Sequence, residues 1–273
     1  MTEKSKFTVP KKFDLSETLD CGQAFRWEEI GENKWFGIAF NKELIIEQKG
    51  KEHIFHCSEE EFHKIWENYF DLSEDYGLIR ERLSALSPVL KEASSFAPGI
   101  RILRQEPWEA VCSFIISQNN NIPRIKGIIK RLCELCGDKT ENGYTFPRPE
   151  TIAEKDEEFL APIRSGFRAK YILSAARKFT EDKDFARKIE TLPLEDARKE
   201  LMTIKGIGPK VSDCALLYGF HRTECFPLDV WMKRAMATLL PDINPDLFGK
   251  DAGIAQQYIF HYSRMHPELF EEK

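Results

Sequence analysis

The sequence has no long hydrophobic run. No apolar stretch approaches the ~18 residues that a membrane-spanning helix needs, and residues 1–7 lack the apolar core of a signal peptide. Hydrophobic residues make up 42% of the 273 residues and charged residues 31%, which is typical of a soluble globular protein with one large or two modest domains. We therefore expect a cytoplasmic protein with no membrane partner.

Cysteine is present but forms no recognisable framework. The seven cysteines are odd in number and irregularly spaced, which fits reduced thiols better than disulfides. The one close pair, Cys133 and Cys136, lies in a helical pattern in which both side chains are expected to face the core. No second pair is present to complete a four-ligand zinc site. We predict neither a metal nor another cofactor.

An excess of positive charge is also missing. The formal net charge is −5 and the pI is about 5.8, which weighs against a protein that coats nucleic acid without specificity. Basic residues at 101–131 and 164–178 nevertheless give local positive density that the sum over the whole chain hides. A protein that binds a few phosphates through amides and a local patch therefore remains consistent with the composition.

The pattern of the chain predicts an α+β fold in two parts. Three segments separated by hairpin signals alternate or cluster apolar residues and predict an antiparallel sheet: 23–29, 34–40 and 43–48. Helical periods follow at 59–69 and 76–86, and residues 94–99 break the pattern. We expect a β-rich N-terminal domain with helices at 1–98, followed by a mainly α-helical domain at 99–273.

A glycine-rich turn dominates the helical part. Gly206 and Gly208 flank one apolar residue and Pro209 follows, so a helix that ends near Lys205 must turn before a new helix begins at Pro209 or Lys210. This is a helix-hairpin-helix signature at 201–220. Glycines allow positive φ and close approach, and the free N–H groups of the new helix suit a phosphate. An ordinary corner between two helices is the alternative interpretation.

Two charged residues near this turn are candidates for chemistry. Lys210 lies in the first turn of the second helix, where the helix dipole disfavours a cation, so its presence suggests a function. Asp229 follows Pro227 by two residues and can cap the helix that begins around Val230. Capping alone is the alternative role for this aspartate.

Residues 205–214, Lys-Gly-Ile-Gly-Pro-Lys-Val-Ser-Asp-Cys, followed by Pro-Leu-Asp-Val at 227–230, resemble the helix-hairpin-helix glycosylase superfamily. Within that superfamily they resemble the 8-oxoguanine DNA glycosylases. The resemblance implies that Lys210 attacks C1′ of a flipped nucleotide and that Asp229 stabilises the developing positive charge. A Schiff base and β-elimination would follow. The attacking amine must be neutral, and we expect burial at the helix N-terminus to favour that form.

The same resemblance bears on cofactors and DNA. It implies that Gly206, Gly208 and Val211 contact DNA, and it allows an alkali cation on the hairpin carbonyls. Some superfamily members carry an iron-sulfur cluster on four cysteines near the C-terminus. This chain has no cysteine after Cys225, so we predict no cluster.

The segment 21–27, Cys-Gly-Gln-Ala-Phe-Arg-Trp, resembles the part of the family that distinguishes the damaged base. The resemblance implies that the carbonyl of Gly22 accepts a hydrogen bond from N7–H of 8-oxoguanine, a donor that guanine lacks. Further base-binding residues implied by the family are Cys214, Pro227, Asp229, Gln256 and Phe260. Gln256 and Phe260 lie four apart on one predicted helix face. A turn glycine and ordinary core residues are the alternatives.

Three asparagines at 119–121 follow a predicted buried helix. In the resembled family such a stretch inserts into the duplex, which implies that Asn119 fills the gap left by the flipped base and that Arg124 reads the opposite cytosine. Phe167, where eukaryotic members have tyrosine, and Arg168 are implied to contact the orphaned base. Turn-forming asparagines and a core phenylalanine beside a solvated arginine are the alternatives.

The implied partner is duplex DNA containing 8-oxoguanine opposite cytosine, and we expect a monomer, associated with the nucleoid if the source is prokaryotic. The implied activity is base excision with weaker strand cleavage. Trp231 departs from the family pattern, in which many members have histidine, and this puts the polar contacts of that position in doubt. Two alternatives remain, a glycosylase for alkylated bases, which typically lacks the lysine, and a non-catalytic module that holds DNA with the hairpin.

Overall fold

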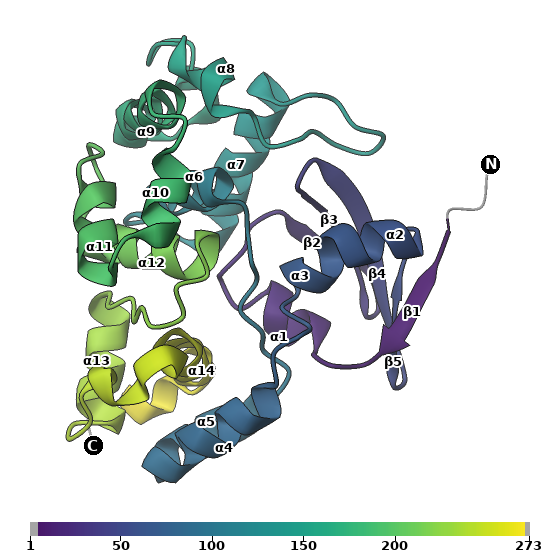
Figure 1. Cartoon of the computed structure of the whole chain (residues 1–273), viewed down its shortest axis with the longest axis vertical. Helices are drawn as coiled ribbons and strands as arrows, with labels where there is room; N and C mark the ends of the chain where they lie inside the picture. Colours follow the sequence, from purple (N-terminus) through teal and green to yellow (C-terminus); the bar gives the residue numbers. More distant parts are fainter. Residues whose placement is uncertain (1–4, 271–273) are drawn as a thin grey trace.

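The N-terminal part is built on an antiparallel sheet. The computed structural model describes residues 5–270, and within them the strands lie in the order β1-β5-β4-β3-β2 (Figure 1). Their bounds are β1 (Phe7–Pro10), β2 (Trp27–Gly31), β3 (Lys34–Ala39), β4 (Lys42–Lys49) and β5 (Glu52–Phe55). The three predicted strands are confirmed, although the first begins at Trp27 instead of residue 23. Strands β1 and β5 go beyond the prediction.

Trp27 and Gly37 show how β2 and β3 pack together. The two residues are paired across the strands, and a Cβ at Gly37 would come within 2.4 Å of the Trp27 ring. Trp27 is buried, and its Nε1 donates a hydrogen bond to Tyr69 Oη at 2.8 Å. Glycine at position 37 therefore lets a large ring lie against the sheet.

Short helices complete this part. They are α1 (Leu15–Leu19) and a continuous helical segment made of α2 (Glu59–Glu61), the π-helical turn η1 (Phe62–Trp66) and α3 (Glu67–Tyr69). The predicted helix at 59–69 is thereby confirmed. Ser58 caps it by accepting from the Glu61 N–H at 3.1 Å. Phe62 packs edge-on against Phe55 of the sheet, with ring centroids 4.8 Å apart, so aromatic contacts attach the segment to β5.

Helices α4 (Tyr76–Leu86) and α5 (Pro88–Phe96) pack against each other, and α5 also packs against α14 (Ala252–Met265) (Figure 1). The helix predicted at 76–86 is confirmed. The buried residues of α4 and α5 belong to the hydrophobic core of the helical part, while the sheet and the segments before residue 73 form a separate core. The domain boundary at residue 98 stays a prediction, and packing joins α4 and α5 to the helical part.

The helical part contains the remaining elements. They are α6 (Pro107–Ser117), α7 (Ile122–Cys136), α8 (Pro149–Ala153), η2 (Ala161–Ile163), η3 (Gly166–Arg168), α9 (Ala169–Glu181), α10 (Phe185–Thr191), α11 (Leu194–Met202), α12 (Pro209–Gly219), α13 (Val230–Leu239), η4 (Pro245–Asp251), α14 (Ala252–Met265) and η5 (Pro267–Phe270). Helix α6 is buried on all sides from 108 to 116. Gly219 lets α12 lie directly against it, since a Cβ there would be 2.8 Å from Ala110 Cβ.

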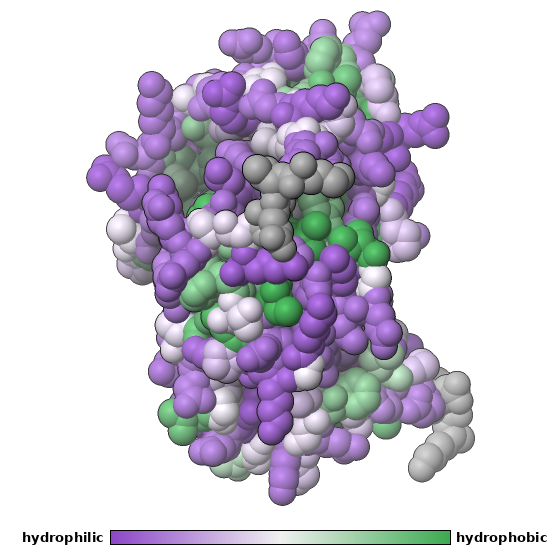
Figure 2. Space-filling view, turned by 90° about the vertical axis from the view of Figure 1, so that its right-hand side faces the viewer, coloured by the Kyte–Doolittle hydropathy of each residue, from purple (hydrophilic) through white to green (hydrophobic). Residues whose placement is uncertain are grey.

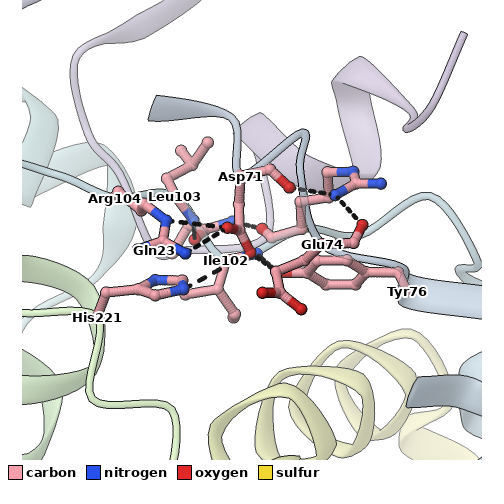
Figure 3. Close-up of polar contacts among 9 residues, drawn as sticks. Gln23, Asp71, Glu74, Tyr76, Ile102, Leu103, Arg104 and His221 are labelled. Carbon is pink, nitrogen blue, oxygen red and sulfur yellow. Dashed lines mark hydrogen bonds and ion pairs between the residues drawn. The ribbon is translucent and has the colours of Figure 1, made fainter. Parts of the chain in front are cut away.

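A buried polar network joins the two parts (Figure 3). Asp71, at the end of the sheet part, is 1% exposed and accepts hydrogen bonds from Arg104 Nε at 2.9 Å and from Tyr76 Oη at 3.0 Å. His221, which follows α12, lies 3.6 Å from the same carboxylate. Burial lowers the pKa of His221 to about 4 despite this neighbour. One carboxylate therefore links the sheet part, α4 and the loop after α12.

The outer surface carries few apolar side chains on the face shown in Figure 2. Hydrophilic residues cover most of it, and hydrophobic residues appear only in small separate groups. Among residues 5–270, no helix combines the length and the hydropathy that crossing a bilayer requires.

Candidate active site

The hairpin places Lys210 at an uncapped helix N-terminus. Helix α12 begins at Pro209, which confirms the prediction, whereas the preceding helix ends at Met202, before the expected Lys205. Gly208 occupies the N-cap position and supplies no side-chain hydrogen bond. The N–H groups in the first turn of α12 therefore receive no side-chain acceptor from their own cap, which leaves them suited to a phosphate oxygen.

The two hairpin glycines serve different purposes. Gly206 has φ +91°, and a Cβ there would come within 2.2 Å of the Tyr171 ring. Gly208 has φ −102°, which any residue adopts, and a Cβ there would meet no atom within 4 Å. The expectation of positive φ is confirmed for Gly206 and wrong for Gly208. At Gly208 the missing side chain leaves open space at the surface of the hairpin.

One small cavity collects the predicted base-binding residues. Its volume is about 50 Å³, and its lining contains seven residues that the sequence singled out: Gly22, Lys210, Cys214, Pro227, Asp229, Gln256 and Phe260. Phe114, Tyr218 and Gln257 also line it and were not predicted. The residues come from the loop after α1, from α6, α12 and α14, and from the segment before α13.

The cavity is small for a nucleobase. A volume of 50 Å³ holds a few water molecules at roughly 10–15 Å³ each, whereas pockets for small ligands usually exceed roughly 300 Å³. Phe260 is only half-buried and forms one wall, and Arg264 lies over its ring at 5.4 Å from the centroid. A base could therefore enter only after lining side chains such as Phe260 move.

Lys210 and Cys214 lie one turn apart on α12 and share the cavity face. The Lys210 Nζ is 5.7 Å from the centroid of the Phe114 ring, so an aromatic wall lies beside the amine. Burial raises the pKa of the Cys214 thiol to about 11, although Lys210 acts in the opposite direction. The sulfur is therefore a neutral, packed side chain rather than a thiolate nucleophile.

Asp229 is both a helix cap and a cavity residue. Its Oδ1 accepts a hydrogen bond from the Met232 N–H at 2.7 Å at the start of α13, which confirms the predicted cap. The same side chain lines the cavity that contains Lys210. The cap fixes the carboxylate in one orientation, so the two interpretations of this residue are compatible.

Gly22 and Gln256 both line the cavity. Gly22 has φ +89°, so its role as a turn glycine is confirmed, and a Cβ there would lie 3.7 Å from Phe260 Cε1. Gln256 is buried on α14, and its Nε2 donates to the Pro227 carbonyl at 3.4 Å. The predicted face shared by Gln256 and Phe260 is confirmed, because both lie on α14 and line the cavity.

The loop between α6 and α7 projects polar side chains. Asn119 is exposed and has φ +47°, and Arg124 is exposed in the first turn of α7. Asn121 caps α7 by accepting from the Arg124 N–H at 3.0 Å. Their contacts with DNA stay predictions, and their positions leave both side chains available at the surface.

Phe167 and Arg168 are neighbours that differ in exposure. Phe167 is 49% exposed, so a buried core role is excluded, but Arg168 is only 3% exposed. The Arg168 guanidinium donates hydrogen bonds to the main-chain carbonyls of Gln118, Asn119 and Ser165. It is thus turned toward the loop after α6 instead of solvent, so the alternative of a solvated arginine is wrong, while its contact with an orphaned base stays a prediction. Arg168 also fixes the loop that carries Asn119.

Trp231 points away from the cavity. Its Nε1 donates to Ser263 Oγ on α14 at 2.8 Å, and its ring packs on Phe270 with centroids 5.1 Å apart. Trp231 is not part of the cavity lining. The departure from the family's histidine therefore leaves the arrangement of Lys210 and Asp229 unaffected.

The cysteines offer no metal site. Cys133 is buried as predicted, whereas Cys136 is only partly buried against the core. Within the described part of the chain, no group of three or more His, Cys, Asp and Glu side chains is placed to hold a metal ion.

Two protein-family models together match residues 6–244 of the chain. Residues 112–244 match the family model described as HhH-GPD superfamily base excision DNA repair protein, and residues 6–111 match the model described as 8-oxoguanine DNA glycosylase, N-terminal domain. A hairpin that presents Lys210 to a cavity is the arrangement expected in that superfamily. The chain belongs to the 8-oxoguanine DNA glycosylase family of the HhH-GPD superfamily.

Individual relatives agree with this assignment. An N-glycosylase/DNA lyase from Saccharomyces cerevisiae is 33% identical over a 256-residue alignment, and the match covers 81% of this chain and 66% of the yeast protein. A probable N-glycosylase/DNA lyase from Methanothermobacter thermautotrophicus is 31% identical over a 239-residue alignment, and the match covers 75% of this chain and 74% of the relative. A crystal structure of Clostridium acetobutylicum 8-oxoguanine glycosylase/lyase with DNA containing cytosine opposite 8-oxoguanine has a TM-score of 0.87 and 35% identity, covering 97% of this chain and 100% of that one.

Proposed function

We propose that the protein is a bifunctional DNA glycosylase/lyase that excises 8-oxoguanine from duplex DNA during base excision repair. The observation that carries the proposal is the single cavity in which Lys210 and Asp229 meet Gly22, Gln256 and Phe260. An amine and a carboxylate provide the covalent chemistry, and the other residues provide a backbone carbonyl, an amide and a ring for a purine. The sequence similarity to named glycosylase/lyases extends over most of the chain.

The reaction begins when the damaged base leaves the helix and its C1′ faces Lys210. The Lys210 amine attacks C1′ as the bond from C1′ to N9 breaks, and the electron pair of that bond leaves with the base. Opening of the sugar ring gives a Schiff base between Nζ and C1′. Loss of a proton from C2′ then expels the 3′ phosphate by β-elimination. Hydrolysis of the Schiff base returns the free enzyme.

Asp229 contributes through a fixed negative charge. The sugar becomes positively charged as the glycosidic bond breaks, and a carboxylate held beside it stabilises that state more than the ground state. The hydrogen bond from the Met232 N–H holds the Asp229 side chain in place. Orientation that is fixed before the reaction costs no reorganisation during it.

Recognition of the damaged base would rest on Gly22, Gln256 and Phe260. The Gly22 carbonyl accepts the N7–H of 8-oxoguanine, whereas guanine presents a lone pair to the same oxygen and leaves it unpaired. A buried unpaired polar group costs about 1–3 kcal/mol. Gln256 contacts the Watson–Crick edge and Phe260 stacks on the purine after it moves to admit the base.

The DNA backbone would contact the hairpin. The open space at Gly208 and the uncapped N–H groups of the first turn of α12, including that of Val211, suit a phosphate. Asn119 on the loop after α6 would fill the gap in the duplex and Arg124 in the first turn of α7 would read the opposite base, with the exposed ring of Phe167 nearby. The related Clostridium complex contains cytosine opposite 8-oxoguanine, and we propose the same preferred pair here. We propose that the protein works in the cytoplasm, in association with the nucleoid if the source is prokaryotic.

Borohydride trapping on a duplex containing 8-oxoguanine tests this function. The wild-type protein should form a covalent adduct when the Schiff base is reduced, and Lys210→Gln should form none while it still binds the duplex. A non-catalytic module would bind without an adduct from the wild-type protein. An alkylated-base glycosylase would release 3-methyladenine faster than 8-oxoguanine.

A further inference from the structure

The main-chain carbonyls on either side of Gly22 are both held by side-chain hydrogen bonds. The Cys21 carbonyl accepts a hydrogen bond from Gln257 Nε2 at 3.1 Å, and the Gln23 carbonyl accepts from Gln105 Nε2 at 2.8 Å. Within residues 5–270, no hydrogen bond ends on the carbonyl of Gly22. Gln257 on α14 and Gln105 before α6 thus fix the two neighbouring carbonyls, while Gly22 itself lines the cavity and its carbonyl receives no donor from residues 5–270.

Gln257 is itself fixed by Tyr218. The Tyr218 hydroxyl donates to Gln257 Oε1 at 2.6 Å, and both side chains are buried. The Tyr218 ring stacks on Phe114, with centroids 5.1 Å apart and an interplanar angle of 17°. The hydroxyl also lies 3.5 Å from Gln256 Oε1. Tyr218 therefore contacts both the amide that holds the Gly22 loop and the amide proposed to read the base.

Burying the polar side chains of Tyr218 and Gln257 between α12 and α14 costs free energy of desolvation. Tyr218 and Gln257 lie on the inner faces of α12 and α14, where apolar side chains would pack without desolvating polar atoms. The pair instead satisfies the Cys21 carbonyl, which would otherwise be buried without a donor. The backbone torsion angles of glycine are little restricted by sterics. The hydrogen bond from Gln257 to the Cys21 carbonyl therefore helps to set the direction of the Gly22 carbonyl.

We propose that Tyr218 and Gln257 are positioning residues that set the discrimination between 8-oxoguanine and guanine, by aiming the Gly22 carbonyl at N7–H. The inference rests on the proposed function and deepens it. A hydrogen bond weakens steeply as its angle falls below about 120°, so a modest rotation of the Gly22–Gln23 peptide, which carries the Gly22 carbonyl, removes the advantage of the damaged base. Neither residue needs to touch the sugar or the leaving group for this effect.

Gln257→Met and Tyr218→Phe test the proposal, because each keeps the shape of the side chain and removes the hydrogen bond. Excision of 8-oxoguanine should fall about tenfold in single-turnover assays, while β-elimination of a preformed abasic site, which needs no base recognition, should stay within about twofold. Binding to duplexes with uncleavable 2′-fluoro nucleotides supplies a second readout. The affinity ratio of 8-oxoguanine over guanine should fall about tenfold.

The double variant should be little worse than either single variant, because both residues act through one chain of hydrogen bonds. Ser94→Ala is the matched control: it removes a buried hydroxyl from α5 outside the cavity lining and should leave the affinity ratio unchanged. Equal losses of excision and abasic-site cleavage, or an unchanged affinity ratio, would overturn the inference. If Gln257→Met does not show a cooperative melting transition, the variant is not properly folded, and the result for Tyr218→Phe alone tests the inference.

Failure of the proposed function gives a different result. In that case the wild-type protein itself would neither excise 8-oxoguanine nor prefer it over guanine in binding. If the wild-type protein shows that preference and both variants retain it, only the roles of Tyr218 and Gln257 are wrong.

Discussion

Arg168 donates a hydrogen bond from Nε to the main-chain carbonyl of Gln118 at 3.0 Å, at the point where α6 ends. Its Nη2 also donates to the Asn119 carbonyl at 3.1 Å. The planar guanidinium thus spans two successive carbonyls that a single ammonium group could not hold in the same way. The conformation of the loop proposed to enter the duplex depends on this contact.

Arg168→Lys should therefore loosen the loop. Lysine cannot form both hydrogen bonds and leaves a partly buried carbonyl without a donor, so we expect the free energy of unfolding to fall by about 1 kcal/mol. Preference for cytosine opposite the damaged base should weaken as well, measured as the ratio of excision rates opposite cytosine and adenine. Arg124→Lys provides the comparison, because Arg124 is exposed. It should alter that ratio and leave the thermal stability unchanged, whereas equal stability of both variants would contradict the role given to Arg168.

The hairpin glycines offer a matched pair of substitutions. Gly206→Ala should destabilise the fold, since the new Cβ would lie 2.2 Å from the Tyr171 ring and φ is +91°. Gly208→Ala should leave the melting temperature nearly unchanged, because its Cβ meets no protein atom within 4 Å. If DNA occupies that space, the second substitution should nevertheless weaken duplex binding in a fluorescence anisotropy titration. Normal binding by Gly208→Ala would show that the phosphate lies elsewhere.

Asp229→Asn separates the cap from the charge. Asparagine caps helices about as well as aspartate, so the free energy of unfolding should change by less than about 0.5 kcal/mol. Loss of the negative charge beside the sugar should lower the rate of base excision by about 100-fold or more. Single-turnover kinetics combined with urea unfolding measures both quantities. If the variant excises the base within a few fold of the wild-type rate, Asp229 acts only as a helix cap and its charge does not contribute to catalysis.

His53 makes stability depend on pH. Burial lowers the pKa of its ring to about 4, with Lys11 and Arg101 acting in the same direction and Asp14 opposing them. The folded protein therefore holds His53 neutral while the unfolded chain binds a proton near pH 6.5. This residue's contribution to stability is complete above pH 6.5 and is lost as the pH falls from 6.5 toward 4.

His53→Phe should remove that part of the pH dependence. Both ring nitrogens of His53 are buried without a hydrogen-bond partner, and the ring lies 4.2 Å from that of Phe13, so an apolar ring fits the surroundings. We expect a gain of about 1 kcal/mol at pH 7 and a flatter curve of unfolding free energy between pH 6.5 and 4. A variant whose stability falls as steeply with acid as the wild type would contradict this account.

Much of the site could be predicted because its signals are local. Proline and glycine at 206–209 mark the hairpin, and the side chain of Asp229 marks the start of α13. The pairing of Gln256 with Phe260 follows from helical spacing. These signals place each residue on its own element, and the family resemblance supplied the reason to bring the elements together.

Other features depend on contacts between distant segments and give no local signal. Tyr218 and Gln257 sit on inward helix faces, where the sequence alone indicates ordinary core residues. The direction of Arg168 depends on where α6 ends, about fifty residues earlier in the chain. Strands β1 and β5 are short, and they become recognisable only because they pair with each other and with β4.

Peptide mapping of the borohydride-trapped complex tests the central claim most directly. After reduction on a duplex containing 8-oxoguanine, proteolysis and mass spectrometry should locate the sugar remnant on Lys210, with neighbouring Lys205 unmodified in the same digest. A remnant on any other amine, or efficient excision with no adduct at all, would contradict the account of Lys210 as the nucleophile.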